Sequence, residues 1–158
     1  MKRASSVGLA VIIIGVIALV LASAVLIVSS RLQSRISLNV GDGVFTAKLA
    51  STPSLRDKGL SGATSLSHDQ ALILAYPSDG KCPIDMKNMK VPLDILWLNN
   101  DKKIIFIVKN ASADSVDTLF TPKSEGRFVI ELPAGSVDNI NIRSGYSAVF
   151  SIDGEKIK

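Results

Sequence analysis

The sequence predicts an α+β domain that is mostly β, with an antiparallel sheet curled into an open barrel, preceded by a single transmembrane helix. Three observations favour this fold class. A long apolar run stands near the N-terminus, several short apolar or alternating runs follow it, and helical signals are confined to one or two short stretches. Because strands and helices do not alternate along the chain, a doubly wound parallel sheet is not expected.

The apolar run at residues 7–28 contains no charged residue. As a helix rising ~1.5 Å per residue it is long enough to cross a bilayer core of ~30 Å. Basic residues flank it on both sides, so the orientation is inferred from the long domain behind it, which is translocated largely regardless of charge. We therefore predict a cytoplasmic N-terminus (1–6), an anchor in contact with membrane lipid (7–28), a linker (29–35) and an extracytoplasmic domain (36–158).

A cleaved signal peptide is the alternative to this anchor. Ala22-Ser23-Ala24 has the A-x-A form that a signal peptidase reads, so secretion after cleavage near Ala24 is the rival localisation. The apolar run continues past this point and is longer than a typical signal-peptide core, which favours the uncleaved anchor.

The expected strands are short runs that either alternate or are uniformly apolar. Gly41-Asp42-Gly43 is a turn signal and predicts a hairpin. Two nearly continuous apolar runs around residues 99–103 predict a central hairpin covered on both faces. In chain order the predicted strands are 36–40, 44–50, 71–76, 84–87, 93–98, 104–109, 127–132 and 147–152.

Helical signals are few. Thr52 as a cap, Pro53 at the first helical position and Gly59 after the last turn predict one short helix. Ser136 is expected to cap a helical turn that ends by residue 142. Residues 111–124 show no periodicity and are predicted to form a long loop.

The composition argues against several classes of function. The chain has one cysteine, Cys82, and one histidine, His68, so it cannot form an internal disulfide or a Cys/His zinc site. Cys82 is expected to be a small core residue, with a reactive or dimer-linking thiol as the alternative. His68 lies in a turn-like run and is expected to be solvated. We predict no cofactor and no metal, because the sequence contains no nucleotide-binding motif and no set of metal ligands. We predict no nucleic-acid partner, because no basic stripe is interleaved with aromatic residues.

The block Cys82 to Leu98 places polar side chains directly beside the most apolar strand of the chain. Such groups must pair with one another or meet a ligand. The candidate ligand-binding residues are Asp85, Lys87, Asn88, Asp94 and Glu131. If the segment around Lys87 is a strand, Met86 and Asn88 share one face.

Two carboxylates in apolar surroundings carry alternative interpretations. Asp94 either locks the turn before its strand or forms one wall of a polar pocket. Glu131 lies inside an apolar strand and needs a partner. If both faced one cleft, they could act as the acid/base pair of a hydrolase or lyase.

Two motifs carry a resemblance to a known family. The first is Met86-Lys87-Asn88-Met89 followed by Pro92-Leu93-Asp94-Ile95, and the second is Arg127, Val129 and Glu131-Leu132-Pro133-Ala134-Gly135. With Gly59-Leu60, Leu66 and Gly145-Tyr146, they resemble the bacterial and archaeal domain of unknown function 192 over roughly residues 43–152.

The resemblance implies a compact, mostly-β fold with little helix and an N-terminal signal or anchor, but no established activity. The chain departs from the family pattern at Asp85, where tryptophan is usual, and at Ser61, where methionine is frequent. A carboxylate in place of a large aromatic ring is expected to alter the mouth of any pocket there.

The sequence thus predicts a binding or accessory module of the cell envelope rather than an enzyme. Its partner is expected to be an unknown small molecule or an envelope protein. The two alternatives are a hydrolase or lyase that uses Asp94 and Glu131, and a structural partner in an envelope complex.

Overall fold

The computed structural model describes residues 6–31, 35–152 and 157. The chain divides into two compact units, residues 1–33 and 34–158. The first contains the helix α1 (Ser6–Arg31). Within the residues that the structure describes, no helix combines the length and the apolar character needed to cross a membrane. This finding corrects the predicted transmembrane helix at 7–28, and with it the predicted single-pass membrane localisation.

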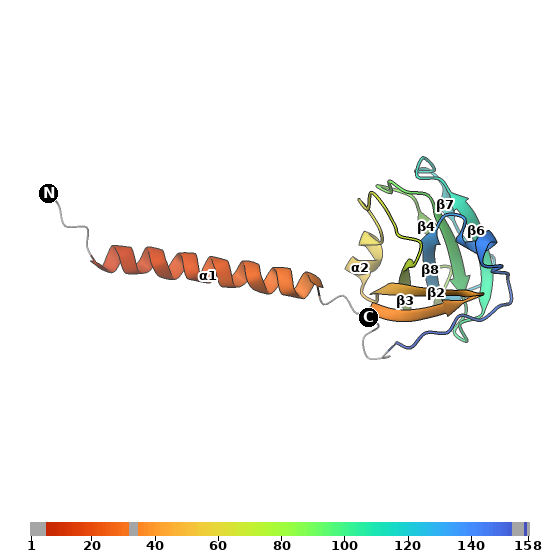
Figure 1. Ribbon diagram of the computed structural model, residues 1–158, viewed down its shortest axis with the longest axis horizontal. Coiled ribbons are helices and arrows are strands. Elements are labelled where there is room, and N and C mark those ends of the chain that lie inside the picture. Colours follow the sequence, from red (N-terminus) through yellow and green to blue (C-terminus); the bar gives the residue numbers. More distant parts are fainter. Residues whose placement is uncertain (1–5, 32–34, 153–156, 158) are drawn as a thin grey trace. The chain divides into compact units, whose positions relative to one another are not determined.

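The second unit is built on a six-stranded sheet in the order β1-β2-β3-β8-β5-β6 (Figure 1). Its strands are β1 (Arg35–Val40), β2 (Gly43–Ala50), β3 (Gln70–Gly80), β5 (Leu93–Leu98), β6 (Ile104–Ala111) and β8 (Gly126–Pro133). Two short strands, β4 (Ile84–Asp85) and β7 (Leu119–Phe120), pair with each other. The helices of this unit are α2 (Pro53–Lys58) and α3 (Ser136–Asn139). The predicted mostly-β character with few helices is confirmed.

The sequence predicted an antiparallel sheet, but one pair of neighbouring strands in the structure is parallel. β2 and β3 run parallel, because the segment that contains α2 carries the chain from the end of β2 back to the start of β3. All other neighbouring strands in the sheet are antiparallel.

The predicted open barrel is wrong, because β1 and β6 remain the two ends of the sheet. The predicted last strand at 147–152 would have been needed to join them. Instead this segment forms only two isolated bridges, Val149 with Asn39 of β1 and Ser147 with Lys103 beside β6. Pairing by one residue at each edge does not make a continuous ladder of hydrogen bonds.

Local signals explain the hairpin and the first helix of this unit. Gly41 turns the chain between β1 and β2 with φ 55°, and a Cβ there would lie 2.6 Å from the Ile140 carbonyl oxygen. Only glycine suits both the backbone angle and the close approach. In α2 the Thr52 hydroxyl accepts a hydrogen bond from the Leu55 amide, and Gly59 follows the last turn with φ 48°.

The sheet buries apolar side chains on both faces. Every residue of β5 is buried. Because side chains alternate along a strand, Leu96 and Leu98 enter one core and Ile95 and Trp97 enter the other. The predicted central hairpin covered on both faces is thus found in part: β5 is covered on both faces, whereas its partner β6 is an end strand and mostly half-buried or exposed.

Cys82 belongs to the second core. Its thiol donates to the Gly126 carbonyl oxygen at 3.5 Å, and its own carbonyl accepts a hydrogen bond from the Trp97 indole at 2.8 Å. Burial raises the pKa of the Cys82 thiol to about 11. The thiol therefore stays protonated at neutral pH, which agrees with a core residue rather than a reactive nucleophile.

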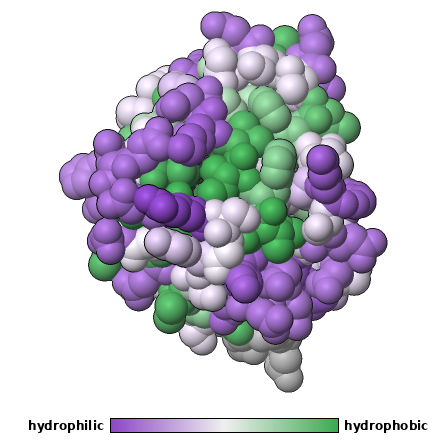
Figure 2. All heavy atoms as spheres, turned by 90° about the vertical axis from the view of Figure 1, so that its right-hand side faces the viewer, coloured by the Kyte–Doolittle hydropathy of each residue, from purple (hydrophilic) through white to green (hydrophobic). Residues whose placement is uncertain are grey.

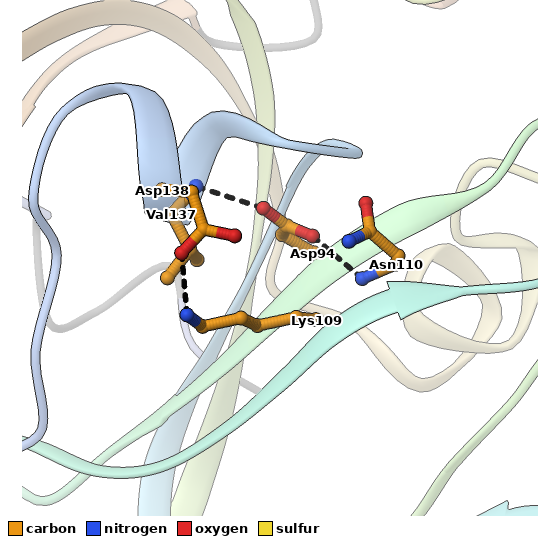
Figure 3. Close-up of polar contacts among 5 residues, drawn as sticks. All are labelled: Asp94, Lys109, Asn110, Val137 and Asp138. Carbon is orange, nitrogen blue, oxygen red and sulfur yellow. Dashed lines mark hydrogen bonds and ion pairs between the residues drawn. The ribbon is translucent and has the colours of Figure 1, made fainter.

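Asp94 is fully buried and holds three parts of the domain together (Figure 3). One carboxylate oxygen accepts a hydrogen bond from the Asn110 amide at 2.7 Å, at the end of β6. The other accepts from the Val137 amide in α3 at 2.8 Å. An exposed ion pair between Lys109 and Asp138 lies beside these bonds. Asp94 therefore fixes β6 and α3 to the sheet, a structural role that differs from the predicted locking of the turn before its strand.

Replacing Asp94 is expected to destabilise the fold strongly. In the Asp94→Asn chain one backbone amide faces an amide nitrogen instead of an oxygen, so we expect a loss of about 3 kcal/mol in the free energy of unfolding. Urea denaturation of the full chain measures this change. The control Asp138→Asn removes only the exposed ion pair and is expected to cost less than about 1 kcal/mol. Equal, small losses in both variants would contradict the assigned role.

Candidate functional site

A cavity of about 620 Å³ lies between α2, the strands β3 and β8, and the chain around β4. It lies on the face of the sheet that carries the second core. The ionisable side chains that line it are Arg56, Asp57, Lys58, Tyr76, Asp85, Lys87 and Glu131. We call this cavity the α2 pocket.

Four of the five predicted site residues line the α2 pocket, namely Asp85, Lys87, Asn88 and Glu131. Asp94 does not. In the register of β5 and β8, Asp94 pairs with Leu132 while Ile95 pairs with Glu131. Since paired residues share a face and neighbours alternate, the two carboxylates point to opposite faces of the sheet. The hydrolase or lyase hypothesis requires Asp94 and Glu131 to face one cleft, and the structure does not bring them together in one.

Lys87 and Asn88 lie in a turn, because the strand predicted at 84–87 ends already at Asp85. The Met89 amide donates to the Met86 carbonyl oxygen at 3.2 Å, and Asn88 adopts φ 58°. As a result, Met86 is fully buried while the side chains of Lys87 and Asn88 are both exposed. The prediction that Met86 and Asn88 share one face is wrong, because strand alternation stops before them.

Asp85 shapes this turn from the mouth of the α2 pocket. Its Oδ1 accepts a hydrogen bond from the Lys87 amide at 2.9 Å. The turn is also tied to the chain after α2, because the Gly62 amide donates to the Asn88 carbonyl oxygen at 3.0 Å. Two walls of the pocket are thus joined by backbone hydrogen bonding.

Glu131 is the most unusual group of the α2 pocket. Glu131 is only 5% exposed, and its neighbours on the adjoining strands are Leu72 and Ile95. Within the described part of the chain, Oε2 has no hydrogen-bond partner. Burial raises the pKa of the Glu131 carboxyl from 4.5 to about 7. The group can therefore hold or release a proton near neutral pH.

Arg56 and Tyr76 also line the pocket, and neither was predicted. The Arg56 guanidinium lies 4.9 Å from the centre of the Tyr76 ring and donates to the Ala75 carbonyl oxygen at 2.9 Å. Burial, above all, raises the pKa of Tyr76 to about 12, so its hydroxyl keeps its proton. The alternation Leu72, Leu74, Tyr76 could have placed the ring on this face. Nothing local in the sequence indicates that α2 covers it.

The pocket combines a buried floor with a charged mouth. Leu74 and Glu131 are buried, whereas Asp57, Lys58 and Lys87 are exposed. The mouth carries charges of both signs, so it has no strong preference for a polyanion. Among the described residues, no group of three or more His, Cys, Asp and Glu side chains is placed to hold a metal ion. The chemistry available at the floor is hydrogen bonding and proton exchange by one carboxyl group.

A second surface lies on the side of the domain that carries β6. Figure 2 shows apolar side chains gathered in the middle of this face and framed by hydrophilic ones. Ile105 and Ile107 of β6 are half-buried, and β6 is an end strand of the sheet. Neither residue lines the α2 pocket.

The pKa of Glu131 predicts a pH dependence of stability. Because the folded-state pKa is raised, folding is favoured most at low pH, and this advantage is lost as the pH rises from 4.5 through about 7. We expect the free energy of unfolding of the unchanged chain, relative to Glu131→Gln, to fall by up to about 3 kcal/mol between pH 4.5 and pH 8. Urea denaturation of both chains at the two pH values measures this difference. A difference that does not change with pH would contradict a raised pKa.

The fold and the pocket can now be compared with known proteins. The family model DUF192, described as "Uncharacterized ACR", matches residues 36–150. "UPF0127 protein TK1120" from Thermococcus kodakarensis is 24% identical over 98 residues, which are 62% of this chain. The match spans 60% of that relative's own length.

Two solved structures share the fold. One, from Sinorhizobium meliloti 1021, is described as a "putative transcription regulator"; it has a TM-score of 0.67 and 26% identity, over 73% of this chain and 92% of that one. The other, a protein of unknown function from Novosphingobium aromaticivorans, has a TM-score of 0.67 and 24% identity, over 73% of this chain and 83% of that one, and shows the fold alone. With the family match over most of the second unit, this chain belongs to the DUF192 family, whose function is unknown.

Proposed function

We propose that this domain is a binding module that takes a small polar molecule into the α2 pocket. One observation carries the proposal, the buried carboxyl of Glu131, whose Oε2 is unpartnered within the described residues although it lines an accessible cavity. Buried polar atoms in folded proteins are nearly always hydrogen-bonded, because an unmet one costs about 1–3 kcal/mol. A bound molecule that reaches Glu131 would complete the missing hydrogen bond.

The size and lining of the pocket suit such a ligand. Its volume of about 620 Å³ falls within the ~300–1,000 Å³ that is usual for small-molecule sites. Leu60, Leu74 and Ile84 supply apolar contact, while Lys87 and Asn88 offer polar groups at the mouth. A few polar groups on an apolar wall are typical of sites that fix the orientation of a ligand.

DNA is a rival ligand, suggested by the description of the Sinorhizobium meliloti protein. Tight contact with a phosphate backbone requires a cluster of unopposed cations. Here Lys58 and Lys87 share the mouth with Asp57 and Asp85. This mixture favours a small ligand over a nucleic acid.

Probe binding tests the proposal. We expect at least one of butylamine, butyrate, butyramide and inorganic phosphate to shift the backbone amide signals of residues 57–61 and 86–89 saturably at millimolar concentration. The measurement is a two-dimensional amide NMR titration of the full chain. Binding at these residues follows from the pocket that they line.

A blocking variant makes this test specific. Ser61 lines the pocket, so Ser61→Trp is expected to weaken the binding at least about tenfold by filling the cavity. Ser37→Trp places the same bulk on exposed β1 and is expected to leave the affinity unchanged. Binding that both variants leave intact, or no binding of any probe, would refute the proposed function.

A further inference from the structure

We propose that the α2 pocket selects ligands that carry a protonated amine, whose ammonium group pairs with the ionised carboxyl of Glu131. This inference rests on the proposed function, because it names the class of ligand for that same pocket. Its basis is the position of one unpartnered carboxyl oxygen at the buried floor of a cavity with a charged mouth.

Among the residues that the structure describes, no cationic side chain forms a salt bridge with Glu131. Of the two salt bridges between described side chains, Lys109–Asp138 and Arg127–Asp79, neither includes Glu131. The only cause that raises the pKa of Glu131 is burial, and no nearby positive group lowers it. A cationic ligand would therefore provide the charge that this carboxylate lacks.

The charged groups around Glu131 come from every wall of the pocket. On α2, Arg56 lies against the Tyr76 ring, while Asp57 and Lys58 are exposed. On β4 and the following turn, Asp85 and Lys87 are exposed as well. Long lysine side chains can keep their ammonium groups in water, where solvent and neighbouring charges of opposite sign screen them. The buried carboxyl of Glu131 therefore has the largest effect on which ligand charge the pocket prefers.

Ligand chemistry favours an amine at this floor. An ionised carboxylate only accepts hydrogen bonds, and an ammonium group offers three donors together with a positive charge. A hydroxyl group offers a donor without the charge. An anion would bind only after Glu131 is protonated, since like charges in a buried site repel strongly.

Proton linkage gives the proposal a quantitative signature. An alkylammonium group stays protonated between pH 6 and pH 8, whereas Glu131 titrates with a pKa of about 7. Amine affinity should therefore fall about tenfold from pH 8 to pH 6, as the ionised fraction of Glu131 decreases. An anionic or acceptor ligand should show the opposite trend.

The experiment compares butylamine with 1-butanol and butyrate, which have similar size but different charge, by NMR titration of the full chain at pH 6 and pH 8. We expect butylamine to bind at least about tenfold tighter than 1-butanol at pH 8 and to lose about tenfold at pH 6. In Glu131→Gln both the preference and the pH dependence should disappear. The control Asp138→Asn removes an exposed carboxylate that does not line the pocket and should change the affinity less than about threefold.

The outcomes separate this inference from the proposed function. If 1-butanol or butyrate binds in a way that Ser61→Trp blocks, while butylamine binds no tighter, the pocket binds ligands but the amine inference is wrong. An amine preference that survives Glu131→Gln would also overturn it. If no probe binds at all, both proposals fail.

Discussion

The antiparallel pairing of β5 with β8 is the constraint on which the rest of this domain depends. These two strands are neighbours in the interior of the sheet, and both are buried along most of their length. Their register sets Asp94 beside Leu132 and Ile95 beside Glu131. Strand alternation then sends the two carboxylates to opposite faces, where the packing around each gives it a different role.

On one face, two backbone amides satisfy Asp94, and its charge is used to fix α3 and the end of β6. On the other face, Glu131 has apolar neighbours and an unpartnered oxygen, and the pocket opens where α2 and the 86–89 turn leave space above it. Asp94 and Glu131 are both buried carboxylic acids, and they differ in their hydrogen-bond partners. A buried carboxylate that accepts two hydrogen bonds stabilises the fold. A buried carboxylate without a partner destabilises it, so its presence calls for a functional explanation such as ligand binding.

Local chemistry made part of this structure predictable. Gly41, Thr52 and Gly59 mark the first hairpin and α2, and the nearly continuous apolar run 93–98 marks the fully buried strand β5. The missed features are non-local. Parallel pairing of β2 with β3 depends on where α2 packs. The turn at 86–89, in which Asn88 has a positive φ, follows a strand that stops at Asp85, two residues before its predicted end. Arg56 joins the site only through that packing. The prediction of a transmembrane helix at 7–28 was wrong for a different reason. It rested only on the length of a run without charged residues, and the structure does not support it.

The position of Glu131 also bears on what the pocket is for. Val129 on the same strand, and Leu72 and Ile95 beside it, belong to the second core and show that this face of the sheet accepts large apolar side chains. A leucine at position 131 would remove the desolvation cost and would enlarge the core that contains Trp97. The hypothesis of a structural partner protein stays a prediction and gives no reason for a carboxyl group here. Ligand binding does give one, because a molecule in the pocket that hydrogen-bonds to the Glu131 carboxyl would offset part of the free energy that its burial costs.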